Sequence, residues 1–136
     1  MHRVIAAVVA IVVKDDRILA MRRAPEKVGA GLWEAVSGRI EPDEQPADAA
    51  LREIGEETAL EVELDPVPVD AYLASRAGEP MLVVVYVARW RGGEVRRSEE
   101  HDQHLFCTPA EFRERSSLAR LADAVDRANA RLRGAP

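Results

Sequence analysis

The sequence predicts an α/β (α+β) fold, a sandwich in which helices cover a mixed central β-sheet. Apolar runs at strand spacing interleave with two main stretches at helical spacing, which is typical of a sheet packed against helices. The first run, Arg3–Val13, is long and almost entirely apolar, as expected of a strand buried on both faces. The polar turn Lys14–Asp16 then returns the chain into Arg17–Arg22 as a hairpin. A hairpin beside a long buried strand favours a mixed sheet.

The middle of the chain contains an extended segment followed by the first main helix. A loop at 24–31 precedes the extended segment Trp33–Ile40. The helix is expected over Pro46–Ala59, because proline suits the first helical position and Asp48 lies near the positive end of the helix dipole. The most acidic part of the chain is therefore predicted to be helical.

The second half supplies the remaining strands and two more helices. Val67–Ala74 and Met81–Arg91 are predicted strands, and the second is so rich in apolar β-branched residues that we expect it near the sheet centre. A short strand at Leu105–Cys107 leads into the capping box Thr108–Glu111, which begins a short helix. A last helix is expected to be capped by Ser116 or Ser117, and its apolar face comprises Leu118, Leu121, Ala122, Val125, Ala128 and Leu132.

Length and composition predict a single globular domain, residues 1–136. Hydrophobic residues make up 47% and charged residues 32% of the chain, which excludes both a disordered chain and a membrane bundle. Cys107 is the lone cysteine, so no intramolecular disulfide is expected. The apolar run Val4–Val13 superficially resembles a signal peptide, but charged residues follow it where small residues would be needed for cleavage. We therefore expect a cytoplasmic protein that contacts no membrane.

The distribution of charge is more informative than the net charge of −5. An acidic chain is not expected to bind a nucleic acid polymer. Ten of the 24 acidic residues lie between Glu41 and Asp65, where Arg52 is the single base. Apolar residues at helical spacing run through this segment, so it is expected to fold. A folded segment with this much negative charge indicates a cation site.

Three glutamates are predicted to stand together on one ridge of the first main helix. Glu53, Glu56 and Glu57 are spaced i, i+3 and i+4. Like charges at this spacing cost about 0.2–0.5 kcal/mol per pair, and only Arg52 is close enough to relieve them. Three convergent carboxylates suit Mg²⁺ or Mn²⁺, although the spacing alone fits a solvated acidic face equally well. The opposite side, predicted to pack on the sheet, comprises Ala47, Ala50, Leu51, Ile54 and Thr58.

A longer motif surrounds these glutamates. Gly38 is followed after five residues by Glu44 and after seven more by the run Arg52-Glu53-Ile54-Gly55-Glu56-Glu57-Thr58-Ala59-Leu60. The segment closely resembles the signature of the Nudix hydrolases, G-x5-E-x7-R-E-U-x-E-E-x-G-U with U a bulky aliphatic residue. The likeness extends to the apolar first strand, to Leu32-Trp33 and to the late segment 99–112. It implies a Nudix-type α/β/α sandwich with a mixed central sheet, with the box at residues 38–60.

Two departures from the family pattern concern small residues. Ala59 replaces the last glycine of the box, where a helix often ends in a left-handed residue. Val36-Ser37-Gly38 replaces the Pro-Gly-Gly that is common before the box. Neither change removes a carboxylate, so the metal site is expected to be intact while the loop after the helix and the approach of substrate differ.

The resemblance implies a metal-dependent hydrolase of the pyrophosphate bond in a nucleoside diphosphate linked to another group. Metal ions, Mg²⁺ or Mn²⁺, neutralise the diphosphate charge and lower the pKa of a bound water. By position, the implied ligands are Glu53, Glu56, Glu57 and the Gly38 carbonyl, with Glu100 as a further ligand or a base. Arg52 is implied to orient the glutamates by pairing with Glu44. For the general base we place Glu53 first and Glu100 second.

Other side chains are weaker candidates for binding substrate or metal. Arg22, Arg23 and Lys27 flank the box and are candidates for holding phosphates, with an ordinary surface role equally acceptable. Trp33 is a candidate for stacking on a base, although packing against the neighbouring loop is the favoured interpretation. We expect neither His101 nor His104 to bind metal, because they lie three apart on a predicted loop.

For the substrate we favour a nucleoside triphosphate that is cleaved to release pyrophosphate, as in MutT-like members. Family hydrolases of dinucleotide polyphosphates and ADP-ribose carry a tyrosine or proline beyond the box, where this sequence has residues 75–78, Ser-Arg-Ala-Gly. Nucleotide sugars remain an alternative substrate. An isopentenyl diphosphate isomerase would need a catalytic cysteine and a longer chain. A non-catalytic nucleotide-sensing module would lack a carboxylate of the box, and all three are present. The expected partner is a small nucleotide, and many relatives form homodimers.

Overall fold

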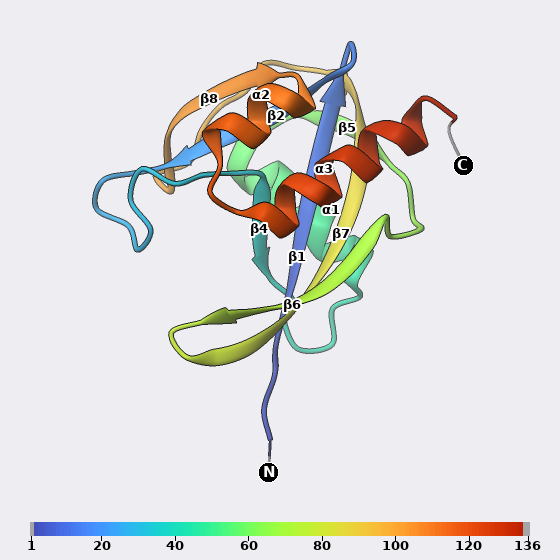
Figure 1. Ribbon diagram of the computed structural model, residues 1–136. Coiled ribbons are helices and arrows are strands. Elements are labelled where there is room, and N and C mark those ends of the chain that lie inside the picture. The colour runs from blue at the N-terminus through green and yellow to red at the C-terminus, as the bar shows by residue number, and fades with distance from the viewer. Residues whose placement is uncertain (1, 135–136) are drawn as a thin grey trace.

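The computed structural model describes residues 2–134, whose strands form one sheet with helices on both faces (Figure 1). Within these residues, every helix is too short or too polar to cross a lipid bilayer. The strands are β1 (Ile5–Lys14), β2 (Arg17–Arg23), β3 (Trp33–Glu34), β4 (Val36–Arg39), β5 (Glu61–Leu64), β6 (Asp70–Arg76), β7 (Glu79–Gly92) and β8 (His101–Cys107). The helices are α1 (Pro46–Thr58), α2 (Pro109–Arg115) and α3 (Ala119–Leu132).

Strand β1 is the centre of the sheet and gives it its mixed character. It runs parallel to β7 and antiparallel to β2 and β4. Strands β5 and β6 pair with β7, and β3 and β8 pair with β2. The predicted mixed sheet and the predicted hairpin between β1 and β2 are therefore confirmed.

Alternate residues of β1 build two hydrophobic cores, one on each face of the sheet. Because successive side chains of a strand point to opposite faces, Val9, Ile11 and Val13 pack toward α2 and α3, whereas Val8, Ala10 and Val12 pack toward α1. Figure 1 shows α3 in front of β1 and α1 behind it. Each buried valine or isoleucine stabilises the fold by about 1.5–3 kcal/mol relative to exposure. The predicted strand buried on both faces and the predicted α/β/α sandwich are confirmed.

Strands β5 and β8 depart furthest from the prediction. Strand β5 was not predicted, although its two glutamates alternate with Val62 and Leu64 against β7. Strand β8 begins at His101 and not at Leu105, because its polar first half pairs with β2 as far as Arg23. Tertiary pairing thus overrides the weak strand propensity of His, Asp and Gln in this segment.

The short helix has its predicted cap, but the last helix does not. Thr108 Oγ1 accepts a hydrogen bond from the Glu111 backbone N–H at 3.2 Å, and the Glu111 carboxylate accepts one from the Thr108 N–H at 3.0 Å. Helix α3 is capped by Leu118, which has no side-chain cap bond, so the predicted serine cap is wrong. The Ser116 hydroxyl instead donates to the Trp33 carbonyl at 2.7 Å and ties α2 to β3.

Ala59 ends α1 in the left-handed conformation that the glycine of the motif would favour, with φ of 60°. We expect Ala59→Gly to raise the free energy of unfolding by about 1 kcal/mol, because glycine adopts this conformation without the Cβ penalty. The same change at Ala130, inside α3, should lower it by about 1 kcal/mol. Urea unfolding of both variants tests the sign, and a less stable Ala59→Gly protein would contradict the strain.

Candidate active site

A cleft of about 770 Å³ lies beside the motif at residues 38–60 and is large enough for a nucleotide-sized ligand. Its apolar wall includes Tyr72 of β6, Met81 of β7 and Leu121 of α3. Its polar lining includes Arg23, Glu34, Gly38, Glu53 and Glu100. The cleft therefore joins an apolar surface to a group of carboxylates.

Helix α1 separates the three predicted glutamates by exposure. The side chains of Glu53 and Glu57 are 12% and 2% exposed, whereas that of Glu56 is 59% exposed. Residues i and i+4 fall on the face that the sheet covers, and residue i+3 falls at its edge. The prediction of a single solvated ridge is therefore wrong, because the carboxylates of Glu53 and Glu57 are buried under the sheet. Leu51, predicted to pack on the sheet, is 43% exposed.

Gly38 of β4 is required by the close approach of Glu53. A Cβ at this position would lie 2.2 Å from the Glu53 carboxyl carbon, which no side chain can accommodate. The Gly38 backbone and the Glu53 carboxylate are thus in direct contact, and both line the cleft. This contact brings the first and the central part of the motif together.

Arg52 holds the carboxylates of the motif in place. Its Nε and Nη2 donate to the two Glu44 oxygens at 2.8 and 2.9 Å, and its Nη1 donates to Glu53 Oε1 at 2.7 Å. Nη2 also reaches the Arg39 carbonyl at 3.0 Å. The predicted pairing of Arg52 with Glu44 is present, in the bidentate form that fixes orientation as well as distance. The Arg52 guanidinium lowers the pKa of Glu44 to about 2.

We expect Glu44→Gln to lower the free energy of unfolding at pH 7, because it replaces the charged half of this bidentate pair. The folded-state pKa of Glu44 is depressed, so its stabilising contribution is present above its ordinary pKa of 4.5 and is lost as the pH falls toward about 2. The difference from wild type should therefore shrink over this window in urea titrations. A constant difference across the window would show that the charge is not the cause.

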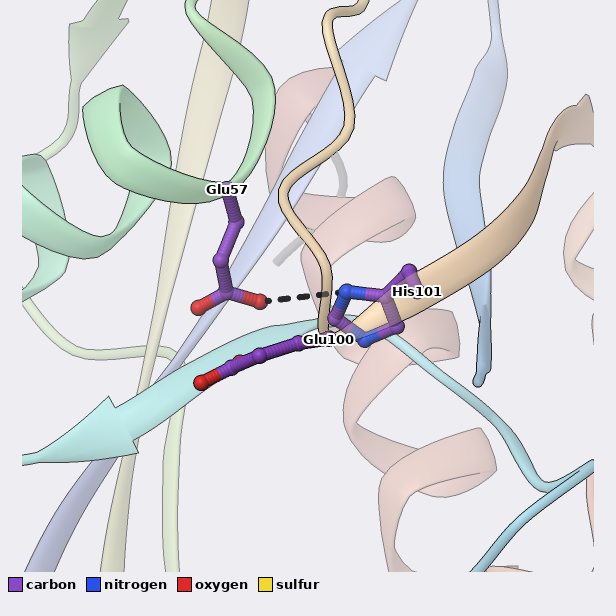
Figure 2. A group of neighbouring side chains, drawn as sticks. All are labelled: Glu57, Glu100 and His101. Carbon is purple, nitrogen blue, oxygen red and sulfur yellow. Dashed lines mark ion pairs between the residues drawn. The ribbon is translucent and has the colours of Figure 1, made fainter. Parts of the chain in front are cut away.

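Glu57 is the most unusual carboxylate of the site. Both of its oxygens are buried and have no hydrogen-bond partner within residues 2–134. Burial, followed by the nearby carboxylates of Glu53, Glu100 and Glu34, raises the pKa of Glu57 far above its ordinary range. Figure 2 shows its carboxylate facing the ring of His101, with Glu100 beside them. One ligand atom from each of these three residues lies within 4.8 Å of the others.

These residues fit a divalent cation. Two unpartnered buried oxygens and adjacent carboxylates form a concentration of negative charge that a single arginine on Glu53 does not neutralise. Oxygen donors at this spacing are those that bind Mg²⁺ or Mn²⁺.

The sequence does not single out Glu34, because an isolated acid in a two-residue strand has no local signature. It accepts hydrogen bonds from Arg23 Nη1 at 3.2 Å and lies 2.8 Å from His101 Nε2.

The remaining predicted residues are divided between the cleft and the surface. Arg23 lines the cleft, but its guanidinium already binds Glu34 and the Val28 carbonyl. Lys27 lies 3.8 Å from Glu99 and does not line the cleft. Trp33 packs on the core beside α2, with the Arg115 guanidinium 5.5 Å from its ring centre. Arg22 forms a bidentate pair with Asp102.

The chain is similar to known proteins over most of its length. The family model described as NUDIX domain matches residues 1–128. A CTP pyrophosphohydrolase of Escherichia coli (strain K12) is 31% identical over 112 residues, which is 80% of this chain and 79% of that protein. A MutT-like protein of Streptomyces ambofaciens is 35% identical over 131 residues, 93% of this chain and 80% of that protein.

A crystal structure of a MutT protein from Methanosarcina mazei Go1 superposes with a TM-score of 0.82 over 96% of both chains, at 19% identity. This likeness shows the fold, and the sequence matches show the family. The cleft, the buried glutamates of α1 and these matches lead to one conclusion: the chain belongs to the Nudix family and is a Nudix pyrophosphohydrolase.

Proposed function

We propose that this Nudix enzyme hydrolyses a nucleoside triphosphate, releasing pyrophosphate and a nucleoside monophosphate. The observation that carries the proposal is a cleft in which Gly38, Glu53 and Glu100 meet an apolar wall, with Glu57 buried beside Glu100. The wall is suited to a nucleobase and the carboxylates to a cation that binds the phosphates. The match to a CTP pyrophosphohydrolase supports a triphosphate substrate.

Nudix hydrolases generally require a divalent metal, and here Glu53, Glu57 and Glu100, with Glu56 and the Gly38 carbonyl, would hold Mg²⁺ or Mn²⁺. When bound, the metal neutralises phosphate charge and acidifies a water. Arg52 fixes the Glu53 carboxylate at 2.7 Å, and Glu44 fixes Arg52 in turn. Glu53 is thereby held in one orientation in which its free oxygen can accept a proton from the attacking water. Glu100 is the second candidate for this role.

Substrate binding is proposed to use the polar residues at the mouth of the motif. Arg23, which already lines the cleft, would exchange its contact with the Val28 carbonyl for a phosphate oxygen. Lys27 would reach the outer phosphates once released from Glu99, a contact of 3.8 Å that is weak at an exposed site. Ser37, which stands where many members have glycine, also lines the cleft. Trp33 contributes by packing, since it lies on the core next to Glu34 of the cleft lining.

The decisive experiment is a screen of the nucleoside triphosphates, ADP-ribose, dinucleotide polyphosphates and nucleotide sugars with Mg²⁺ or Mn²⁺. We expect turnover of at least one triphosphate, with pyrophosphate as the released product, and complete loss of turnover in excess chelator. Restoring the metal should restore the rate. Turnover that persists in chelator would contradict the metal requirement, and release of inorganic phosphate alone would contradict the cleavage position.

A further inference from the structure

His101 is a buried histidine that the predicted ligand set does not include. It is the first residue of β8, it follows Glu100 directly, and its side chain is 0% exposed. Its Nε2 lies 2.8 Å from Glu34 Oε2, and its Nδ1 lies 3.6 Å from Glu57 Oε1. The ring therefore stands between two carboxylates from different elements, β3 and α1. Figure 2 shows the side of the ring that faces Glu57.

The contacts of Glu34 indicate which nitrogen of the His101 ring carries the proton. Its Oε2 also accepts a hydrogen bond from Arg23 Nη1 at 3.2 Å, so this oxygen acts as an acceptor and His101 Nε2 is the donor. In a neutral imidazole the other nitrogen then carries a lone pair. That nitrogen, Nδ1, is turned toward Glu57. The arrangement is the one by which a carboxylate behind a ring fixes the tautomer of a metal-binding histidine.

His101 Nδ1 and the Glu57 carboxylate face each other without a hydrogen bond between them. Nδ1 and both Glu57 oxygens are buried without a hydrogen bond in the part of the chain that the structure describes. A separation of 3.6 Å is too long for a hydrogen bond. Two lone pairs facing each other repel unless a proton or a metal ion lies between them. Ligand bonds of roughly 2.0–2.2 Å allow two such atoms to share one ion at this separation.

We propose that His101 Nδ1 is a ligand of the divalent cation and forms a mixed nitrogen and oxygen site with Glu57 and Glu100. This inference rests on the proposed function, in which the two glutamates hold the metal. Glu34 acts behind the ring and orients it. Both Mg²⁺ and Mn²⁺ are bound well by oxygen, but Mn²⁺ is a first-row transition ion and accepts an imidazole nitrogen more readily than Mg²⁺ does. The site should therefore bind Mn²⁺ more tightly than Mg²⁺ by a margin that depends on His101.

The test uses Mn²⁺ alone as the probe, with no nucleotide present. Electron spin echo spectroscopy of the Mn²⁺-bound protein should show coupling to a directly bound imidazole ¹⁴N, and labelling the histidines with ¹⁵N should replace that coupling. His101→Asn should remove it and weaken Mn²⁺ binding by at least about 10-fold, with a smaller effect on Mg²⁺. His104→Asn is the matched control, because His104 instead contacts Arg97 at 2.7 Å, and it should leave the coupling unchanged.

The outcomes separate this inference from the proposed function. Bound Mn²⁺ without histidine ¹⁴N coupling, in a protein that hydrolyses triphosphate, overturns the ligand role of His101 and leaves the function standing. It would mean that a proton fills the gap and that His101 only supports Glu57. A protein that neither binds Mn²⁺ nor hydrolyses any nucleotide overturns both. If His101→Asn does not fold, ¹⁵N labelling of the histidines in the unaltered chain still shows whether a histidine nitrogen binds Mn²⁺.

Discussion

Glu57→Gln is expected to lower kcat by at least about 100-fold, which is the usual effect of removing one group that stabilises charge in a transition state. The Glu57 carboxylate lies at the centre of the proposed cation site, within reach of Glu100 and His101. The amide of glutamine is a neutral and poorer ligand for a hard cation. Steady-state kinetics at saturating Mg²⁺ or Mn²⁺ measure the effect, and wild-type turnover would contradict it.

The same substitution should stabilise the protein when no metal is present, by about 1 kcal/mol or more at neutral pH. The unfolded chain ionises Glu57 freely above its ordinary pKa of 4.5, whereas burial raises the folded-state pKa. Folding at neutral pH therefore either buries the charge or takes up a proton, and both cost free energy. Glutamine incurs neither cost. The advantage of the variant should fade as the pH falls through 4.5, because below this pH the wild-type carboxyl is protonated in both the folded and the unfolded state.

Glu56→Gln provides the matched control for stability. Glu56 belongs to the same helix, but its side chain is 59% exposed and lies 3.4 Å from Arg52 Nη1. Removing an exposed charge should change the metal-free stability by less than about 1 kcal/mol. Thermal melts in chelator compare the two variants directly. A Glu57→Gln protein that melts below wild type would show that the buried Glu57 carboxylate stabilises the metal-free fold, and it would contradict the predicted cost of its burial.

The parts of the fold that follow a strong local pattern could be predicted from the sequence. The unbroken apolar run of β1 specified a strand buried on both faces, and its alternate residues do build the two cores. Proline at the start of α1 and the capping box of α2 located both helix starts. Strand β5 and the first half of β8 were not predicted, because they contain many polar residues and are held by pairing with β7 and β2.

From local pattern alone, the candidate site was predictable only where its residues share one helix, whereas Gly38, Glu44 and Glu100 were predicted from the resemblance to the family. Spacing brought Glu53 and Glu57 together, but a helix pattern does not specify which arc the sheet covers. Glu53 and Glu57 were therefore expected to face solvent and are buried, whereas Leu51 was expected to be buried and is exposed. Glu34 and His101 come from β3 and β8, which are far apart in sequence and adjacent only through β2. Their contact at 2.8 Å depends on the sheet order, which no local pattern reveals.

Glu53 is the expected general base. Glu53→Gln is expected to lower kcat by about 10²–10⁴-fold and to remove the acidic limb of the pH–rate profile, whereas Glu100→Gln should lower the rate less and keep that limb. A base must be held within hydrogen-bond reach of the water. Glu53 meets this condition, because Arg52 binds one of its oxygens at 2.7 Å and the Gly38 backbone closes one side.

Glu100 is held less firmly, because it belongs to the turn before β8, and a turn positions a side chain less precisely than a helix does. Measuring Mn²⁺ affinity alongside kcat separates loss of the base from loss of a ligand. If Glu100→Gln abolishes the acidic limb while Glu53→Gln mainly weakens Mn²⁺ binding, the order is reversed. The turn before β8 would then supply the base, and the contact of Arg52 with Glu53 would serve to hold a metal ligand in place.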